Sequence, residues 1–280
     1  MSDNKFKLTA YISDESLTIL KQGGYKLCIA REVNGKYNVV FISVIEHLFQ
    51  NVFEFEEQYR VFGTKKFEAG ALIEASTRRR VPIMPGQEIP LSLEGGFGSV
   101  TGYVDRSKPF MVNSNYYHPI HFGVDALVSQ DYAAIHVSEG PYVAQAVPLK
   151  PSRKIMIWFD KELESGMMIY HTVYNCMHVS SALLIPHPPS PKSVAQVDFT
   201  NTSDVTINYA APKDAPAKGV WSYGALPMMV VGQTYDPRTN RFYVTPEDLP
   251  SADMFVKMAE LLHLDPPTHH GSAGEVHAHK

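Results

Sequence analysis

Strand–turn–strand patterns recur along this chain. Residues 26–41 and 154–169 each contain two apolar strand-like runs around a turn, and the glycine- and aromatic-containing segments 96–99 and 219–222 repeat at nearly the same separation. A further hairpin pattern occurs at 121–139 and again at 228–247. Pairs of similar segments that lie a nearly constant number of residues apart indicate a duplicated β-unit. Two related units bring their loops together at a boundary, where pockets commonly form.

Strand signals dominate, which predicts an all-β fold. Asn34-Gly35 favours a two-residue hairpin, because both positions tolerate positive φ. Residues 13–21 are either a short helix or irregular, whereas 251–264 has helical periodicity after an N-cap serine. We expect two related β-sandwich-like units packed side by side and one short C-terminal helix. The predicted divisions are 1–148 with an extra loop at 102–120, 149–250, the helix at 251–264, and a disordered tail at 265–280.

Composition limits the classes of function. The net charge is −4 and the basic run Arg78-Arg79-Arg80 is short, so we do not expect the broad basic face of a nucleic-acid-binding protein. No apolar run approaches the roughly 20 residues of a membrane-spanning helix. The N-terminal residues lack the apolar stretch of a secretory signal, and Cys28 and Cys176 are expected to be buried free thiols. These features predict a cytoplasmic protein that does not span a membrane.

Motifs for cofactors and metals are absent or incomplete in the sequence. The chain has no Gly-x-Gly-x-x-Gly after a strand and no Gly-x-Ser-x-Gly, so we predict neither a nucleotide cofactor nor a serine hydrolase. His118 and His121 form the closest histidine pair, but Pro119 disfavours the helix that would bring their side chains together. Only Asp125 lies near them as a further ligand. The prediction is therefore no metal and no cofactor.

The extra loop is the first candidate site. Most of the residues within 102–120 have no counterpart in the second half, and this segment contains Phe110, Tyr116, Tyr117 and His118. An added loop is free to carry binding groups, although it would equally serve as a simple cover over the boundary between units. A second cluster of large polarisable side chains, which suit either an apolar ligand or a packed core, occurs on the hairpin around 154–170: Met156, Trp158, Met167, Met168 and Tyr170.

Two segments resemble a known group of proteins. Residues 58–77, followed by Pro85-Gly86-Gln87, and residues 157–168 resemble β-rich proteins of filamentous fungi that are related to cofactor-free cyclases of secondary metabolism. These include hetero-Diels–Alderases of tropolone sesquiterpenoid pathways. The shared motifs are strands and turns, and none is a catalytic signature.

The resemblance implies a cofactor-independent cyclase of the lyase or isomerase type. A benzylic alcohol would lose water to give a quinone methide, which an alkene would capture inside a dry aromatic pocket. The implied partner is an apolar aromatic or terpenoid small molecule, and a homodimer is left open. The candidate acid and base residues are Tyr117, His118, His121 and His136, and the candidate substrate-binding residues are Phe110, Tyr116, Trp158, Met168 and Tyr170.

Two other functions remain open. Duplicated β-sandwiches also occur in lectins and in proteins that bind membrane lipids, and exposed Tyr and Trp on loops would favour that alternative. The remaining alternative is a scaffold without a ligand, in which side chains fill the boundary between the units.

Overall fold

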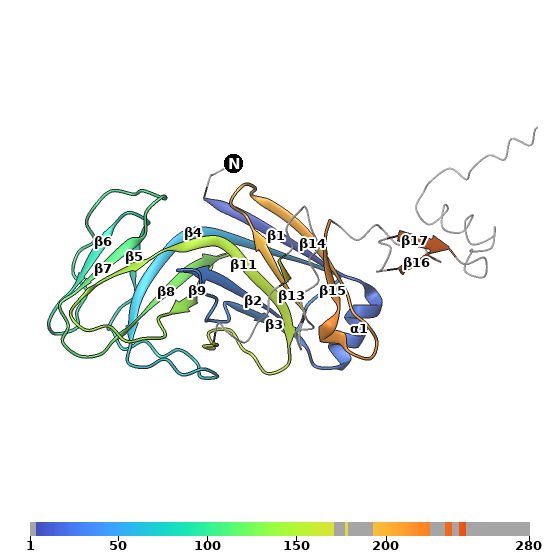
Figure 1. The fold of residues 1–280 in the computed structure, drawn as a ribbon, viewed down its shortest axis with the longest axis horizontal. Helices are drawn as coiled ribbons and strands as arrows, with labels where there is room; N and C mark the ends of the chain where they lie inside the picture. The colour runs from blue at the N-terminus through green and yellow to red at the C-terminus, as the bar shows by residue number, and fades with distance from the viewer. Residues whose placement is uncertain (1–3, 171–176, 179–192, 225–232, 237–240, 245–280) are drawn as a thin grey trace, which may run out of the picture. The chain divides into compact units, whose positions relative to one another are not determined.

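The computed structural model of this 280-residue chain describes residues 4–170, 177–178, 193–224, 233–236 and 241–244 (Figure 1). Within these ranges the chain forms seventeen strands and a single α-helix, so the all-β prediction is confirmed. Some strands, such as residues 5–12 and 88–91, alternate apolar and polar residues, whereas residues 26–33, 121–128 and 151–160 contain continuous runs that are buried on both faces.

In chain order, the elements are β1 (Lys5–Ile12), α1 (Asp14–Gln22), β2 (Lys26–Val33), β3 (Ile42–Val44), β4 (Gln50–Thr64), β5 (Val81–Ile83), β6 (Glu88–Leu91), β7 (Phe110–Ser114), β8 (His121–Val128), β9 (Asp131–Val137), β10 (Ala146–Leu149), β11 (Pro151–Asp160), β12 (Met177–His178), β13 (Val194–Asp198), β14 (Asp204–Ala210), the 3-10 helix η2 (Pro216–Lys218), β15 (Val220–Tyr223), β16 (Gln233–Asp236) and β17 (Arg241–Val244).

Four sheets contain these strands. A seven-stranded sheet has the order β15-β14-β1-β4-β8-β9, with β5 also paired to β4. A five-stranded sheet has the order β12-β13-β11-β2-β3, and a three-stranded sheet has the order β10-β7-β6. Strands β16 and β17 form a separate antiparallel pair. The three-stranded sheet lies at the opposite end of its unit from α1 (Figure 1).

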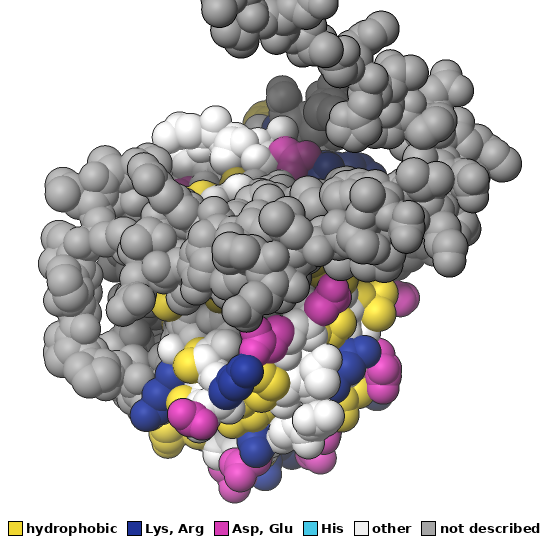
Figure 2. Space-filling view, turned by 90° about the vertical axis from the view of Figure 1, so that its right-hand side faces the viewer, with side chains coloured by type: hydrophobic (Ala, Val, Ile, Leu, Met, Phe, Trp, Pro, Cys, Tyr) yellow, Lys and Arg dark blue, Asp and Glu magenta, His cyan; other side chains and the backbone are white. Residues whose placement is uncertain are grey.

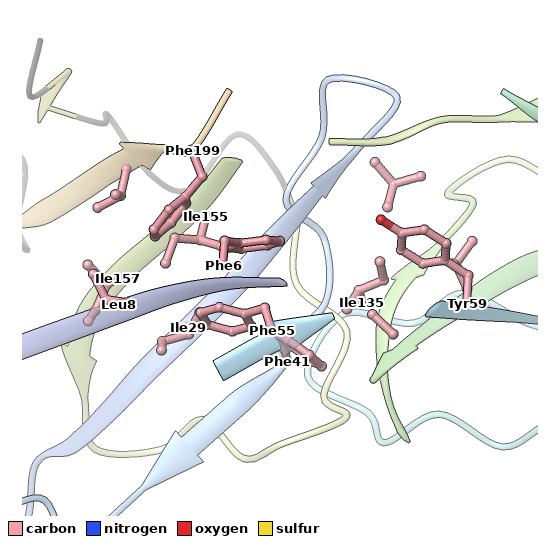
Figure 3. Packing of buried hydrophobic residues seen from close by; sticks show 14 of the residues in the cluster. Phe6, Leu8, Ile29, Phe41, Phe55, Tyr59, Ile135, Ile155, Ile157 and Phe199 are labelled. Carbon is pink, nitrogen blue, oxygen red and sulfur yellow. The ribbon is translucent and has the colours of Figure 1, made fainter. Parts of the chain in front are cut away.

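The main core lies between the seven-stranded and five-stranded sheets. On β1 every second side chain is buried, beginning with Phe6 and Leu8, and these face Ile155 and Ile157 of β11 (Figure 3). The ring of Phe6 lies 5.1 Å from that of Phe55 on β4. Because each such side chain contributes about 1.5–3 kcal/mol when buried, this shared core holds the two sheets together.

The structure divides the chain at a different place from the predicted boundary after residue 148. Strand β1 pairs with β14, and β2 pairs with β11, so strands from both predicted units lie in the same sheets. The compact units are Met1–Leu226 and Pro227–Lys280. The two similar segments at 26–41 and 154–169 lie side by side, because Ile29 of β2 is paired with Ile157 of β11.

Local predictions can be compared with the remaining elements. The predicted hairpins at 121–139 and 228–247 correspond to the antiparallel pairs β8–β9 and β16–β17. The segment after Ser13 is helical: Ser13 Oγ accepts a hydrogen bond of 3.3 Å from the N–H of Ser16, which satisfies one of the free N–H groups of the first turn. The predicted helix at 251–264, the tail at 265–280 and Cys176 lie outside the described residues. No helix in the described ranges is long and apolar enough to cross a membrane.

Candidate functional site

Part of the predicted extra loop at 102–120 forms strand β7. It pairs in parallel with β6 and in antiparallel with β10, through Val112 in both cases. Alternate side chains of β7 are buried, and the ring of Phe110 packs 6.3 Å from that of Tyr59. Phe110 therefore belongs to the main core and is not available to bind a ligand.

A groove lies where β6 and β7 end. Two adjoining cavities of about 440 and 580 Å³ share four lining residues, Ser76, Thr77, Glu94 and Gly95. We call this the β6–β7 groove. The smaller cavity is also lined by Lys65, Tyr116, His118, Pro119 and Ile120, and the larger one by Arg78, Arg79, Gly96 and Phe97. Both volumes fall in the range of about 300–1,000 Å³ that is usual for small-molecule sites.

One wall of the groove is fixed to the end of β4. The N–H of Ser76 donates a 2.7 Å hydrogen bond to the carbonyl of Gly63, and the N–H of Gly63 donates one of 3.1 Å to Thr77 Oγ1. A Cβ on Gly63 would lie 2.5 Å from Ile120 Cδ1 and 2.8 Å from Thr77 Cγ2. Only glycine therefore allows this close approach of the two segments.

The opposite wall is the tight turn that follows β6. Ser92 and Gly96 are joined by a backbone hydrogen bond of 2.9 Å, and Gly95 has a φ of +77°. The ring of Tyr116 packs over Gly95, with its Cε2 3.3 Å from the place where a Cβ would stand. The Nη2 of Arg79 donates a 3.1 Å hydrogen bond to the carbonyl of Phe97, which ties the two walls together.

The last arginine of the run anchors the segment behind the groove. Asp125 on β8 has no exposed side-chain surface and accepts hydrogen bonds from Arg80 and from both Nε and Nη2 of Arg60, the latter two at 3.1 and 2.9 Å. Burial raises the pKa of Asp125, and the two guanidinium groups act in the opposite direction. A buried carboxylate is retained in proteins when it is paired in this way.

Positive charge predominates in the groove. Lys65 and Arg78 are exposed, and within the described ranges neither makes an ion pair. Glu94 is the only carboxylate among the groove residues; a hydrogen bond from the Ser92 side chain holds its pKa below the ordinary value, so it is ionised at neutral pH. With Arg79 included, three cations and one anion line the groove of a chain whose net charge is −4.

The predicted acid and base residues are not all in one place. Tyr116 and His118 line the groove, with their ring centroids 5.2 Å apart. The side chain of Tyr117 is 70% exposed and does not line it. His121 is buried, and its Nδ1 lies 2.7 Å from the carbonyl of Ser138. His136 on β9 is also buried, and burial lowers its pKa to about 3.

The predicted aromatic and methionine lining residues lie in separate parts of the molecule. Trp158 is fully buried in a cluster that includes Met156, whereas Met168 belongs to another cluster that includes Phe62. Tyr170 is exposed, and its ring centroid lies 5.7 Å from that of Phe67. With Phe110 in the main core, these side chains pack against protein and do not surround one shared cavity.

The sequence pattern does not single out the polar residues of the groove. The run Arg78-Arg79-Arg80 indicates only a short basic patch, and Glu94-Gly95-Gly96 indicates only a turn. These residues come together only because loops from β4, β6 and β7 approach one another in the fold, and no local sequence pattern predicts that approach.

The structure also bears on metal binding. No group of three His, Cys, Asp or Glu in the described part of the chain could hold an ion.

Surface charge is mixed on the face seen in Figure 2. In its described area, Lys and Arg side chains alternate with Asp and Glu, and apolar side chains lie between them.

Comparisons with protein-family models, curated proteins and solved structures gave no match. The resemblance to fungal cyclases accordingly stays a prediction.

Proposed function

We propose that the β6–β7 groove binds a saccharide and that the protein is a lectin-like binding protein. The observation that carries this proposal is the combination of the Tyr116 ring with polar and charged side chains around an open groove. A sugar ring has apolar C–H faces and hydroxyl groups at its edges. The first suit an aromatic surface, and the second need hydrogen-bond donors and acceptors.

The groove supplies both kinds of contact. Ser76, Thr77 and Glu94 line both cavities. The hydroxyls of Ser76 and Thr77 donate to the carbonyls of Gly63 and Arg79, so each keeps acceptor capacity for a ligand, and the carboxylate of Glu94 accepts as well. Two rigid walls support them, because backbone hydrogen bonds fix the segments at Gly63 and at Ser92. A preformed site loses less conformational entropy on binding, which favours affinity for a small polar ligand.

A glycan array tests this proposal. The labelled wild-type protein should retain a defined subset of saccharides. Tyr116→Ala should weaken that binding about tenfold, since burying a large apolar side chain fully contributes about 1.5–3 kcal/mol and a ligand covers only part of this ring. Tyr103→Ala is the matched control, because Tyr103 is 93% exposed and lies in the loop before β7, outside the groove. Absence of any retained saccharide, or full binding by Tyr116→Ala, would contradict the proposal.

A second candidate is the cofactor-independent cyclase implied by the resemblance. The observation that favours it is the contact between Tyr116 and His118 beside Lys65 and Glu94, because these groups form an acid–base set in one groove. General acid–base catalysis contributes about 10²–10⁴-fold. The open groove argues against it, since a quinone methide must be shielded from water.

The cyclase candidate has its own assay. The protein would be incubated with an ortho-hydroxybenzylic alcohol and an apolar alkene, and the cycloadduct measured by mass spectrometry. Catalysis predicts formation above the uncatalysed rate, with a lower kcat for His118→Gln. A rate equal to that without protein would reject this candidate and leave the binding proposal untouched.

A further inference from the structure

We propose that the groove selects an acidic saccharide, whose carboxylate or sulfate groups are bound by Arg78 in one cavity and by Lys65 in the other. This inference rests on the proposed saccharide binding and names its ligand class. Its starting point is that the groove holds three exposed cations without an ion-pair partner in the described ranges, Lys65, Arg78 and Arg79, in a chain that is negative as a whole.

The three consecutive arginines have different surroundings. Arg80 is bound to Asp125, and its guanidinium lies 4.2 Å from the ring centroid of Phe62. Arg79 donates to the carbonyl of Phe97. Arg78 lines the groove with an exposed side chain and has no such partner within the described ranges. Of the three, Arg78 is therefore the one whose guanidinium is free to bind a ligand, and its fork suits a carboxylate or sulfate.

The adjacent lysines differ in the same way. Lys66 forms an ion pair of 3.0 Å with Glu68, whereas Lys65 lines the smaller cavity without a carboxylate partner in the described ranges. Because the two cavities share residues 76, 77, 94 and 95, a ligand that spans both meets Lys65 in one and Arg78 in the other. A ligand that enters both cavities and meets both cations must be larger than an isolated small anion, and an oligosaccharide meets this condition.

Hydrogen bonds fix the chain on both sides of Arg78. Ser76 and Thr77 are hydrogen-bonded to Gly63 on one side, and Arg80 is bound to the buried Asp125 on the other. The backbone that carries Arg78 is thus positioned before a ligand arrives. The ionised Glu94 repels anionic groups near itself, so the acidic groups of the ligand are expected at Arg78 and Lys65, while Glu94 accepts hydrogen bonds from sugar hydroxyls.

Titration calorimetry with three disaccharides tests the inference. The probes are neutral chitobiose, an unsulfated chondroitin disaccharide that carries one carboxylate, and its sulfated form. We expect the acidic probes to bind the wild type about tenfold or more tightly than chitobiose, and added salt to weaken only the acidic probes. The two acidic probes distinguish carboxylate from sulfate as the preferred group.

Matched variants assign the effect to the groove. Arg78→Gln and Lys65→Gln should each reduce the preference for acidic over neutral probes, and Lys66→Gln, which changes charge equally outside the groove, should preserve it. Equal affinity for chitobiose and the acidic probes, with binding still lost in Tyr116→Ala, would overturn the acidic preference and leave saccharide binding standing. An acidic preference that Lys66→Gln reduces as much as Lys65→Gln would also overturn it. If none of the probes binds and the glycan array retains no saccharide, both the acidic preference and the proposed saccharide binding are wrong.

Discussion

Acid should destabilise this protein through His136. The side chain is 3% exposed on β9, and its Nδ1 has no hydrogen-bond partner among the described residues. Burial, with a smaller contribution from the charge of Lys36, lowers its pKa from 6.5 to about 3. The charged imidazolium is therefore disfavoured in the folded state, and the test is to lower the pH with and without this histidine.

The direction and size of the change in stability with pH follow from the linkage between proton binding and folding. Below pH 6.5 the unfolded chain binds a proton at this position that the folded chain does not, so stability falls as the pH is lowered. Each pKa unit corresponds to about 1.36 kcal/mol, which gives a loss of about 2 kcal/mol at pH 5 and roughly 5 kcal/mol below pH 3. Above about pH 7 the group contributes no pH dependence.

Urea unfolding at pH 7.5 and pH 5.0 measures this directly. The wild type should lose about 2 kcal/mol more of its free energy of unfolding than His136→Leu between these two pH values. His118→Gln removes an exposed histidine and should retain the wild-type loss. Equal losses in wild type and His136→Leu would refute the argument that burial keeps this imidazole neutral.

Two further predictions concern stability. Asp125→Ala leaves Arg60 and Arg80 without their buried partner, and since both arginines are partly exposed we expect a loss of about 2–3 kcal/mol in urea unfolding. A loss no larger than that of Glu68→Ala, which breaks an exposed pair, would contradict this role. Gly123→Ala would place a Cβ 2.1 Å from the Phe62 ring and should cost about 1–3 kcal/mol by overpacking. Gly140→Ala, where nothing lies within 4 Å, is the control and should leave the melting temperature unchanged.

The sequence is informative where structure is local. Alternating patterns and continuous apolar runs predict strands, and Asn34-Gly35 predicts a turn whose two φ angles, 52° and 76°, are both positive. Strand pairing between distant segments is not predictable in this way. The parallel pair β1–β14 joins residues about 200 positions apart, and the similar segments that suggest separate units are the neighbouring strands β2 and β11 of one sheet.

The candidate site is predictable only in part. Tyr116 and His118 are candidates because they lie in a segment without a counterpart, and both line the groove. Trp158 and Met168 are candidates for their size and polarisability, which suit a packed core as well as a ligand pocket, and they are buried in packed clusters. Arg78 cannot be recognised from the sequence, because its neighbours Arg79 and Arg80 have the same side chain and only the fold gives the three different partners.

The central claim is that a saccharide binds between the turn after β6 and the segment after β7. Its most direct test is a map of backbone amide chemical shifts during titration with the sulfated chondroitin disaccharide. We predict that the largest changes fall on residues 76–79, 94–97 and 116–120, with saturation as the disaccharide is added. Changes centred on Tyr103 and Asp105 instead, or no saturable change in the groove, would contradict the account.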